Sequence, residues 1–167
     1  MEDAASRDAY RDELTHVDEA GEVRMVDVSE KDTTRRIAVA ESSILMHPET
    51  QAMVLEDRAK KGDVLACARV AGIMASKRTS DLIPMCHPLP IQKCSVDYEL
   101  DEINGIIRAF CTVKTEGKTG VEMEALTGVQ VTLLTIYDMC KAIDKHMVMS
   151  NIHLVEKTGG KSGDFHF

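Results

Sequence analysis

The stretch CSVDYELDEINGIIRAFCTVKT, residues 94–115, predicts an antiparallel hairpin. Apolar and polar residues alternate over residues 94–100, which is the period of a half-buried strand. Asn104-Gly105 favours a tight turn, because both residue types accept a positive φ. Residues 106–115 resume the strand pattern, so the hairpin supplies two neighbouring strands of a mainly antiparallel sheet.

The chain before the hairpin predicts a strand, two helices and a stiff loop. The apolar run 39–46 is typical of a strand and stops at a His-Pro pair, because proline disfavours continuation. Helical patterns follow over residues 48–60 and 64–77. Three prolines within residues 81–90 exclude a regular element there, so a shaped loop is expected.

The chain after the hairpin predicts one long helix and a last strand. A glycine-containing turn at residues 117–120 leads into a proline-free helical pattern from residue 121 to about 145, and residues 152–156 favour a strand. The order strand, helices, strand, strand, helix, strand predicts an α+β fold. It matches a ferredoxin-like split βαβ arrangement, with helices packed on one face of a mainly antiparallel sheet.

Composition limits the classes of function. The chain has 167 residues and a formal net charge of -8, which repels a phosphate backbone and argues against a nucleic-acid partner. Aromatic residues make up only 4%, so platforms for base stacking are scarce. No apolar run is long enough to span a membrane, and no membrane partner is expected.

The cysteines and the N-terminus indicate a cytoplasmic location. The five cysteines are odd in number and lack CxxC spacing, so they are expected to be reduced thiols. The first residues show neither the basic nor the apolar region of a signal peptide. Residues 1–13 have the composition of a mobile acidic leader, and residues 14–167 are expected to form a single catalytic domain.

Asp138 and Lys141 are the candidate acid-base pair. They lie at i and i+3 on the predicted long helix, where side chains are neighbours, and Lys145 is expected on the same polar side. From spacing alone, a solvated surface ion pair is the commoner explanation. Apolar neighbours such as Leu134 would stay exposed unless a second subunit or a substrate covers this side. A partly buried Lys141 would then have a lowered pKa.

Other polar patterns give weaker signals. The start of the long helix carries Lys118, Glu122 and Glu124 around free backbone N–H groups, which suits a polar ligand or merely the helix dipole. The stretch 60–63 is more often a solvated turn. Cys86-His87 has no second pair at zinc spacing, so no metal site is expected.

The GGKS stretch at residues 159–162 does not complete a phosphate-binding P-loop. The first glycine of that motif would have to stand at position 155, which is Val. A basic tail that closes over an anion is the functional interpretation, and simple fraying of the terminus is the alternative.

Several motifs together resemble the MoaC family of molybdenum-cofactor biosynthesis, from about Leu14 to Phe165. They are MVDVS (25–29), KGDV (61–64), LIPMCHPL (82–89), KTGVEMEALT (118–127), TIYDMCKA (135–142) and GGKSGD (159–164). The resemblance implies a lyase that converts 3',8-cyclo-7,8-dihydroguanosine 5'-triphosphate into cyclic pyranopterin monophosphate and pyrophosphate. It also implies a ferredoxin-like fold and a homohexamer, a trimer of dimers, with active sites between subunits.

The resemblance also implies roles for individual residues. Asp138 and Lys141 are similar to the catalytic pair of the family. The residues similar to its substrate-binding set are Met85, Cys86, His87, Met123, Glu124, Lys61, Arg36, Lys157 and, more weakly, Glu122. The basic members suit a triphosphate. No cofactor is required, although Mg²⁺ could accompany the triphosphate.

Two other functions compete with the enzyme. A non-catalytic scaffold that binds a pterin would show binding without product, but it has little need for a paired acid and amine. A nucleic-acid-binding ferredoxin-like module is disfavoured by the acidic balance and the scarce aromatic residues.

Overall fold

The computed structural model describes residues 16, 20–56, 62–161 and 163–167, so the predicted leader and Lys61 lie outside it. Along the chain the elements are β1 (Thr34–Leu45), α1 (Pro48–Leu55), α2 (Val64–Ser76), α3 (Thr79–Leu82), β2 (Lys93–Asp101), β3 (Ile106–Gly117), α4 (Glu122–Cys140), β4 (Val148–Thr158) and β5 (Phe165–His166).

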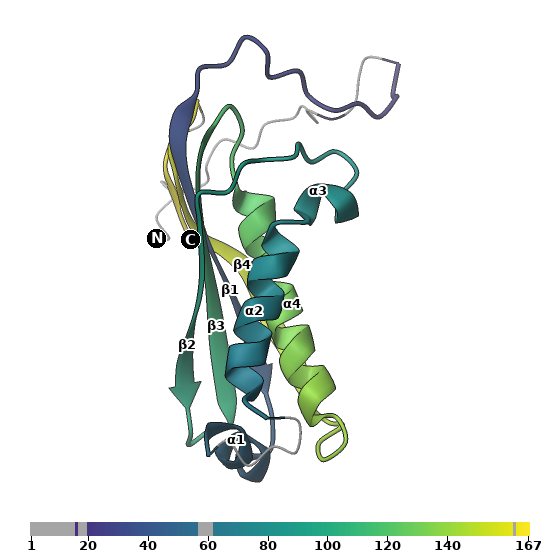
Figure 1. Ribbon diagram of the computed structural model, residues 1–167, viewed down its shortest axis with the longest axis vertical. Helices are drawn as coiled ribbons and strands as arrows, with labels where there is room; N and C mark the ends of the chain where they lie inside the picture. Colours follow the sequence, from purple (N-terminus) through teal and green to yellow (C-terminus); the bar gives the residue numbers. More distant parts are fainter. Residues whose placement is uncertain (1–15, 17–19, 57–61, 162) are drawn as a thin grey trace, which may run out of the picture.

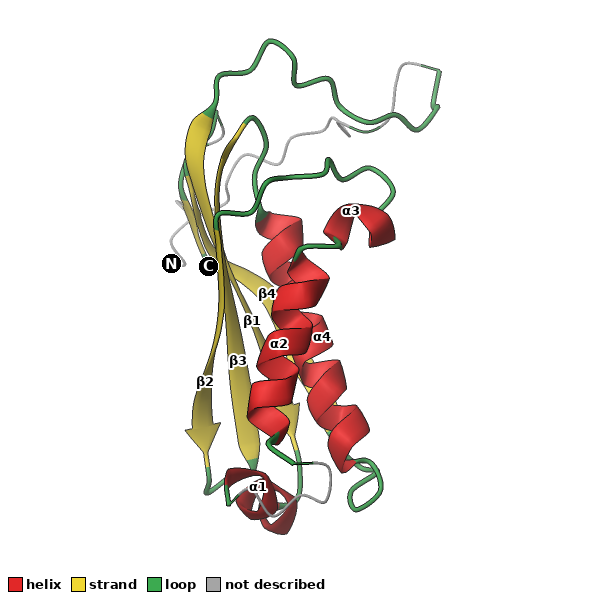
Figure 2. Cartoon of the chain, viewed as in Figure 1, coloured by secondary structure: helices red, strands yellow, loops and turns green. Residues whose placement is uncertain are grey.

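The five strands form one antiparallel sheet in the order β2-β3-β1-β4-β5, with α2 and α4 packed side by side on one face (Figures 1 and 2). β1 and β2 both run antiparallel to β3, which lies between them, so they are parallel to each other across the α2 connection. β3 and β4 likewise both run antiparallel to β1, which lies between them, so they are parallel to each other across the α4 connection. The predicted α+β, ferredoxin-like arrangement is confirmed.

The core lies between the sheet and the two long helices. Alternate residues of β3 are fully buried, which confirms the predicted period of two, and a stripe along α4 packs against them. At the crossing of the helices, a Cβ on Gly72 of α2 would lie 2.8 Å from the backbone oxygen of Gly128 in α4. The buried apolar residues of β3 and α4 are Ile107, Ala109, Cys111, Val113, Ala125, Val129, Leu133, Ile136 and Cys140.

The start of β1 and the end of α4 differ from the prediction. β1 begins at Thr34, five residues before the apolar run, because Arg35 and Arg36 pair with β3 through their backbones. α4 ends at Cys140 rather than near residue 145, since the N–H groups of Ile143 and Asp144 turn back to the oxygen of Cys140. The expected place of Lys145 on the helix is therefore wrong.

The end of α1 and both ends of β4 also differ from the prediction, and α1 stops five residues before the expected end near residue 60. α1 ends at Leu55, where Glu56 is the C-cap, and β4 is longer than the predicted 152–156. Gly105 has a φ of +68°, as the predicted hairpin turn requires. Within the proline-rich loop, residues 83–92 form no helix or strand, as expected, while α3 adds one short turn before them.

Candidate active site

The predicted binding segments meet at the N-terminal end of α4. The loop residues Met85, Cys86 and His87 face the first turn of α4, and together they line a cavity of about 330 Å³. The structure thus brings together six predicted site residues from two segments that lie far apart in the sequence. The cavity is lined by His16, Val26, Val28, Lys31, Met85, Cys86, His87, Leu89, Thr119, Gly120, Glu122, Met123 and Glu124.

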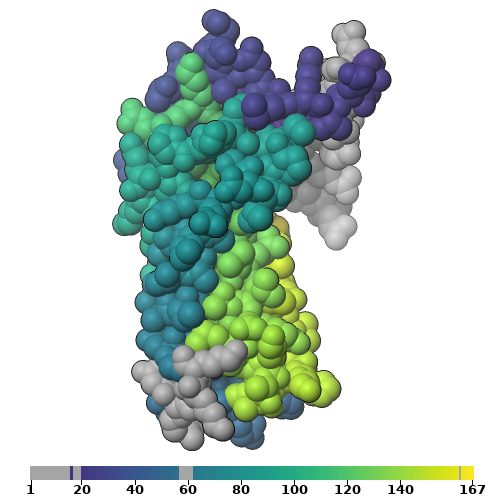
Figure 3. Space-filling view, turned by 45° about the vertical axis from the view of Figure 1, so that its right-hand side comes forward, coloured from purple at the N-terminus to yellow at the C-terminus, as the bar shows by residue number. Residues whose placement is uncertain are grey.

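The segment before β1 also reaches this cavity. Val26, Val28 and Lys31 contribute to its wall, next to the loop of residues 83–92 (Figure 3). Residues 25–29 belong to one of the motifs that resemble the family, but no role in the site was predicted for them. The motif itself marked this segment, but its contact with the start of α4 could not be predicted, because the two segments are far apart along the chain.

Glu124 is the most perturbed carboxyl group of the cavity. Its side chain lies in the first turn of α4 and the residue is only 4% exposed. Burial and, to a smaller extent, the nearby charge of Glu122 raise the pKa of Glu124 to about 7. Burial and Glu124 together also raise the pKa of Cys86. Near neutral pH the Glu124 carboxyl can therefore donate a hydrogen bond as well as accept one.

Two predicted basic residues, Lys157 and Arg36, lie next to the cavity but are not part of its lining. Lys157 on β4 forms an ion pair with Glu122, with 3.2 Å between Nζ and Oε1, and both side chains are mostly buried. Arg36 on β1 donates from Nη2 to the backbone oxygen of Lys118 at 3.2 Å. The buried Nε of Arg36 has no hydrogen-bond partner within the part of the chain that the structure describes. Neither of these two side chains is part of the cavity lining, to which Lys31 contributes a basic side chain.

The candidate catalytic pair lies at the other end of α4. Lys141 Nζ and Asp138 Oδ1 are 2.6 Å apart, so the predicted i, i+3 contact is present. Their side chains are 54% and 58% exposed in the single chain. The hydrogen bond and the charge of Asp138 raise the pKa of Lys141. The lowered pKa was expected only for a Lys141 that a second subunit or a substrate covers, and it stays a prediction; in one chain the neighbouring carboxylate favours the charged ammonium.

One chain does not bring the pair and the cavity together. Glu124 and Asp138 are 14 positions apart on one straight helix, which corresponds to about 21 Å along its axis. Lys61 falls outside the described residues; the end of α1 and the start of α2, which flank it in sequence, lie at the Asp138 end of the molecule (Figure 1).

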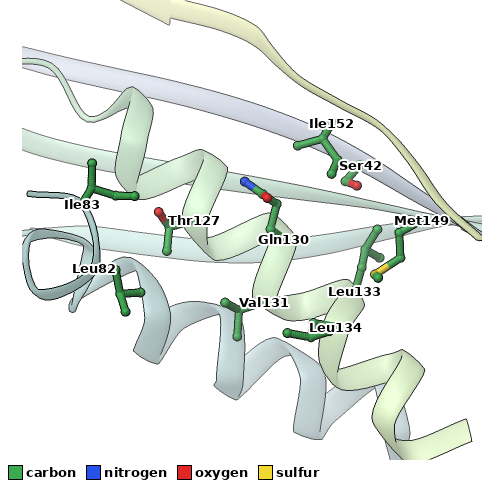
Figure 4. A pocket seen from close by; sticks show the side chains of 10 residues that line it. All are labelled: Ser42, Leu82, Ile83, Thr127, Gln130, Val131, Leu133, Leu134, Met149 and Ile152. Atoms are coloured by element: carbon green, nitrogen blue, oxygen red, sulfur yellow. The ribbon is translucent and has the colours of Figure 1, made fainter. Parts of the chain in front are cut away.

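An apolar groove of about 320 Å³ runs between these two ends (Figure 4). Leu134 on α4 and Ile152 on β4 face it and remain about half exposed. The expected exposed apolar surface beside Asp138 is therefore present. The groove is lined by Ser42, Leu82, Ile83, Thr127, Gln130, Val131, Leu133, Leu134, Met149 and Ile152.

Among residues 16, 20–56, 62–161 and 163–167, no three His, Cys, Asp or Glu side chains come together as a metal-binding group. Over the same ranges, no helix has the length and apolar character needed to cross a membrane.

Comparisons with known proteins identify the family. The sequence model of the MoaC family matches residues 25–160. A protein of Heliobacterium modesticaldum named cyclic pyranopterin monophosphate synthase is 61% identical over 154 residues, which are 92% of this chain and 97% of that protein. A protein of the same name from Brucella ovis is 57% identical over 152 residues, 91% of this chain and 92% of that protein.

A solved structure of the ferredoxin protease FusC in complex with Arabidopsis ferredoxin gives a TM-score of 0.27 at 16% identity. It matches 62% of this chain and 9% of that chain, and so weak a likeness carries no argument. The match to the family model and the identity to its relatives, each over most of the chain, lead to one conclusion: the chain belongs to the MoaC family.

Proposed function

We propose that the chain is a lyase that converts 3',8-cyclo-7,8-dihydroguanosine 5'-triphosphate into cyclic pyranopterin monophosphate and pyrophosphate, in molybdenum-cofactor biosynthesis. The observation that carries this proposal is the 61% identity to a cyclic pyranopterin monophosphate synthase over nearly the full length of both chains.

In this proposal the cavity at the start of α4 binds the substrate. The neutral form of Glu124 can donate to an acceptor on the purine-derived ring, and His87 can contact its polar edge. Arg36 and Lys157 offset the charge of the phosphates, with Lys157 exchanging its contact with Glu122 for a phosphate oxygen. Lys61 is proposed to join them, as the resemblance to the family implies.

Asp138 and Lys141 are proposed to move protons. Their 2.6 Å contact lets a proton pass between them while the purine-derived ring opens and the pyranopterin closes. Formation of the cyclic phosphate joins a substrate hydroxyl oxygen to the first phosphorus and breaks the bond to the second phosphate, so pyrophosphate leaves. The hydroxyl proton needs an acceptor, and this pair can provide one.

The site is proposed to lie between two copies of the chain. An exposed stripe along α4 contains Met123, Gln130, Leu134 and Asp138, which share one helix face. Val131 lies midway between Glu124 and Asp138 in sequence. A two-fold axis beside Val131 would therefore set the Asp138 end of one α4 beside the Glu124 end of its antiparallel copy.

This pairing supports a dimer as the catalytic unit and, with the resemblance to the family, a homohexamer built as a trimer of dimers. It would bury the apolar groove and part of the Asp138–Lys141 pair, which the single chain leaves exposed. Burial of Lys141 in the dimer would lower the pKa that Asp138 raises in one chain. We propose a cytoplasmic location and no resident metal, with any Mg²⁺ arriving on the triphosphate.

The direct test incubates the purified protein with the cyclised GTP intermediate. Pyrophosphate and cyclic pyranopterin monophosphate are expected in equal amounts. Binding of the intermediate without either product, by protein of the expected oligomeric mass, would instead support a carrier.

A further inference from the structure

Asp144 is a buried carboxylate beside the candidate catalytic pair. It lies three residues after Lys141 and is 3% exposed. Its Oδ2 accepts hydrogen bonds from the backbone N–H of His47 at 2.9 Å and from the hydroxyl of Thr50 at 3.4 Å. Its Oδ1 accepts from the backbone N–H of His146 at 2.9 Å. Both carboxylate oxygens are therefore occupied.

These contacts join two elements that are far apart in the sequence. His47 is the N-cap of α1 and makes no capping bond with its own side chain. Asp144 supplies an acceptor at this helix start from 97 positions away. α1 is itself tied to the hairpin, because Gln51 donates to the backbone oxygens of Asp101 and Ile106 at 3.3 Å and 3.0 Å.

The turn that carries Lys141 is fixed at both of its ends. At one end Lys141 is the C-cap of α4, and its N–H donates to the oxygen of Tyr137 at 2.8 Å. At the other end Asp144 accepts the hydrogen bonds from His47 and Thr50 at the start of α1. Residues 141–143 between these anchors are exposed, so their own side chains do not hold the turn in place.

From this geometry we infer that Asp144 is a positioning residue for the reaction, acting through Lys141. The inference rests on the proposed role of Lys141. By fixing the turn after α4 onto α1, Asp144 holds the Lys141 ammonium against Asp138 in the bound geometry. Loss of this anchor lets the turn shift, and a displacement of about 1 Å at a reacting group can cost on the order of a hundredfold in rate.

The test compares Asp144→Ala with Gln51→Ala in the full-length oligomer, well below the melting temperature of each variant. Gln51 is buried and anchors α1 to the hairpin, but no described contact joins it to residues 141–146. We expect Asp144→Ala to lower kcat at least tenfold with KM changed less than about threefold, since substrate binding at the other end of α4 is intact. Gln51→Ala should lower stability while keeping kcat within about twofold.

Asp144→Asn provides a second measurement where the alanine variant fails to fold. It keeps one acceptor oxygen and the side-chain size, so its kcat should fall between those of wild type and Asp144→Ala. Wild-type kcat in Asp144→Asn, or equal kcat losses in Asp144→Ala and Gln51→Ala, would overturn the inference. The Lys141→Ala variant separates the two proposals. If Lys141→Ala is active, the catalytic pair is refuted. If Lys141→Ala is inactive while Asp144→Ala is fully active, only the positioning role of Asp144 is refuted.

Discussion

Mixing two inactive variants tests whether the site is shared between subunits. Lys141→Ala removes the amine at one end of α4, and Glu124→Gln removes the titrating carboxyl about 21 Å away at the other end. If each site combines the Lys141 end of α4 from one subunit with the Glu124 end of α4 from the other, a mixed dimer contains one site with both mutations and one site with neither. Each variant alone should be inactive, and only the mixture should regain activity.

The expected recovery follows from random exchange. An equal mixture yields about half mixed dimers, each with one intact site of two, so about a quarter of wild-type activity should return. The assay measures pyrophosphate release after the subunits are exchanged in mild denaturant, and mass spectrometry of differently tagged chains verifies the exchange.

A matched control mixes Lys141→Ala with Asp138→Ala. Both changes lie at the same end of α4, so every site in every dimer carries at least one of them and no activity should return. If the Lys141→Ala and Glu124→Gln mixture stays inactive although mixed dimers are present, a site shared across the two-fold axis is refuted.

Three further predictions concern pH, packing and assembly. As pH rises from about 4.5 through 7, the folded protein loses the stabilisation that the neutral form of Glu124 provides. The wild-type free energy of unfolding should therefore fall by up to about 3 kcal/mol relative to that of Glu124→Gln, as measured by urea titrations at pH 5 and pH 8. Equal pH dependence of the two proteins would contradict this. Gly72→Ala would place a Cβ 2.1 Å from a threonine oxygen of α4 and should cost about 1–3 kcal/mol by calorimetry, whereas Gly117→Ala, with its nearest atom at 3.8 Å, should cost less. Leu134→Glu puts a charge into the apolar groove and should reduce the oligomer mass in light scattering, and an unchanged mass would exclude this groove from the subunit interface.

Side-chain periodicity made the sheet and the helix packing predictable. The alternation of β3 and the Asn104-Gly105 turn predicted the hairpin, and the order of elements then predicted the ferredoxin-like fold. The start of β1 was not predictable in this way, because Arg35 and Arg36 enter the sheet through backbone pairing that their side chains do not indicate. The end of α4 depended on the turn from Cys140 to Asp144, whose anchor, α1, is remote in sequence.

The candidate site was predictable where contacts are local. Asp138 and Lys141 meet because helical spacing requires it, and their 2.6 Å contact confirms that proximity. The pairing of Lys157 with Glu122, and the place of Val26 and Val28 beside Met85, depend on long-range packing that spacing does not encode. The roles of these residues stay predictions. The lowered pKa of Lys141 also stays a prediction, since it requires burial by a second subunit or a substrate, and in one chain Asp138 raises this pKa.

The proposed mechanism depends on proton transfer by Lys141, which Asp138 holds in place. Single-turnover measurement of pyrophosphate release by Lys141→Ala, with substrate binding and oligomer mass determined on the same sample, tests it most directly. We expect a rate at least about a hundredfold below wild type with binding nearly unchanged. A near-normal rate from the correctly assembled variant would contradict it.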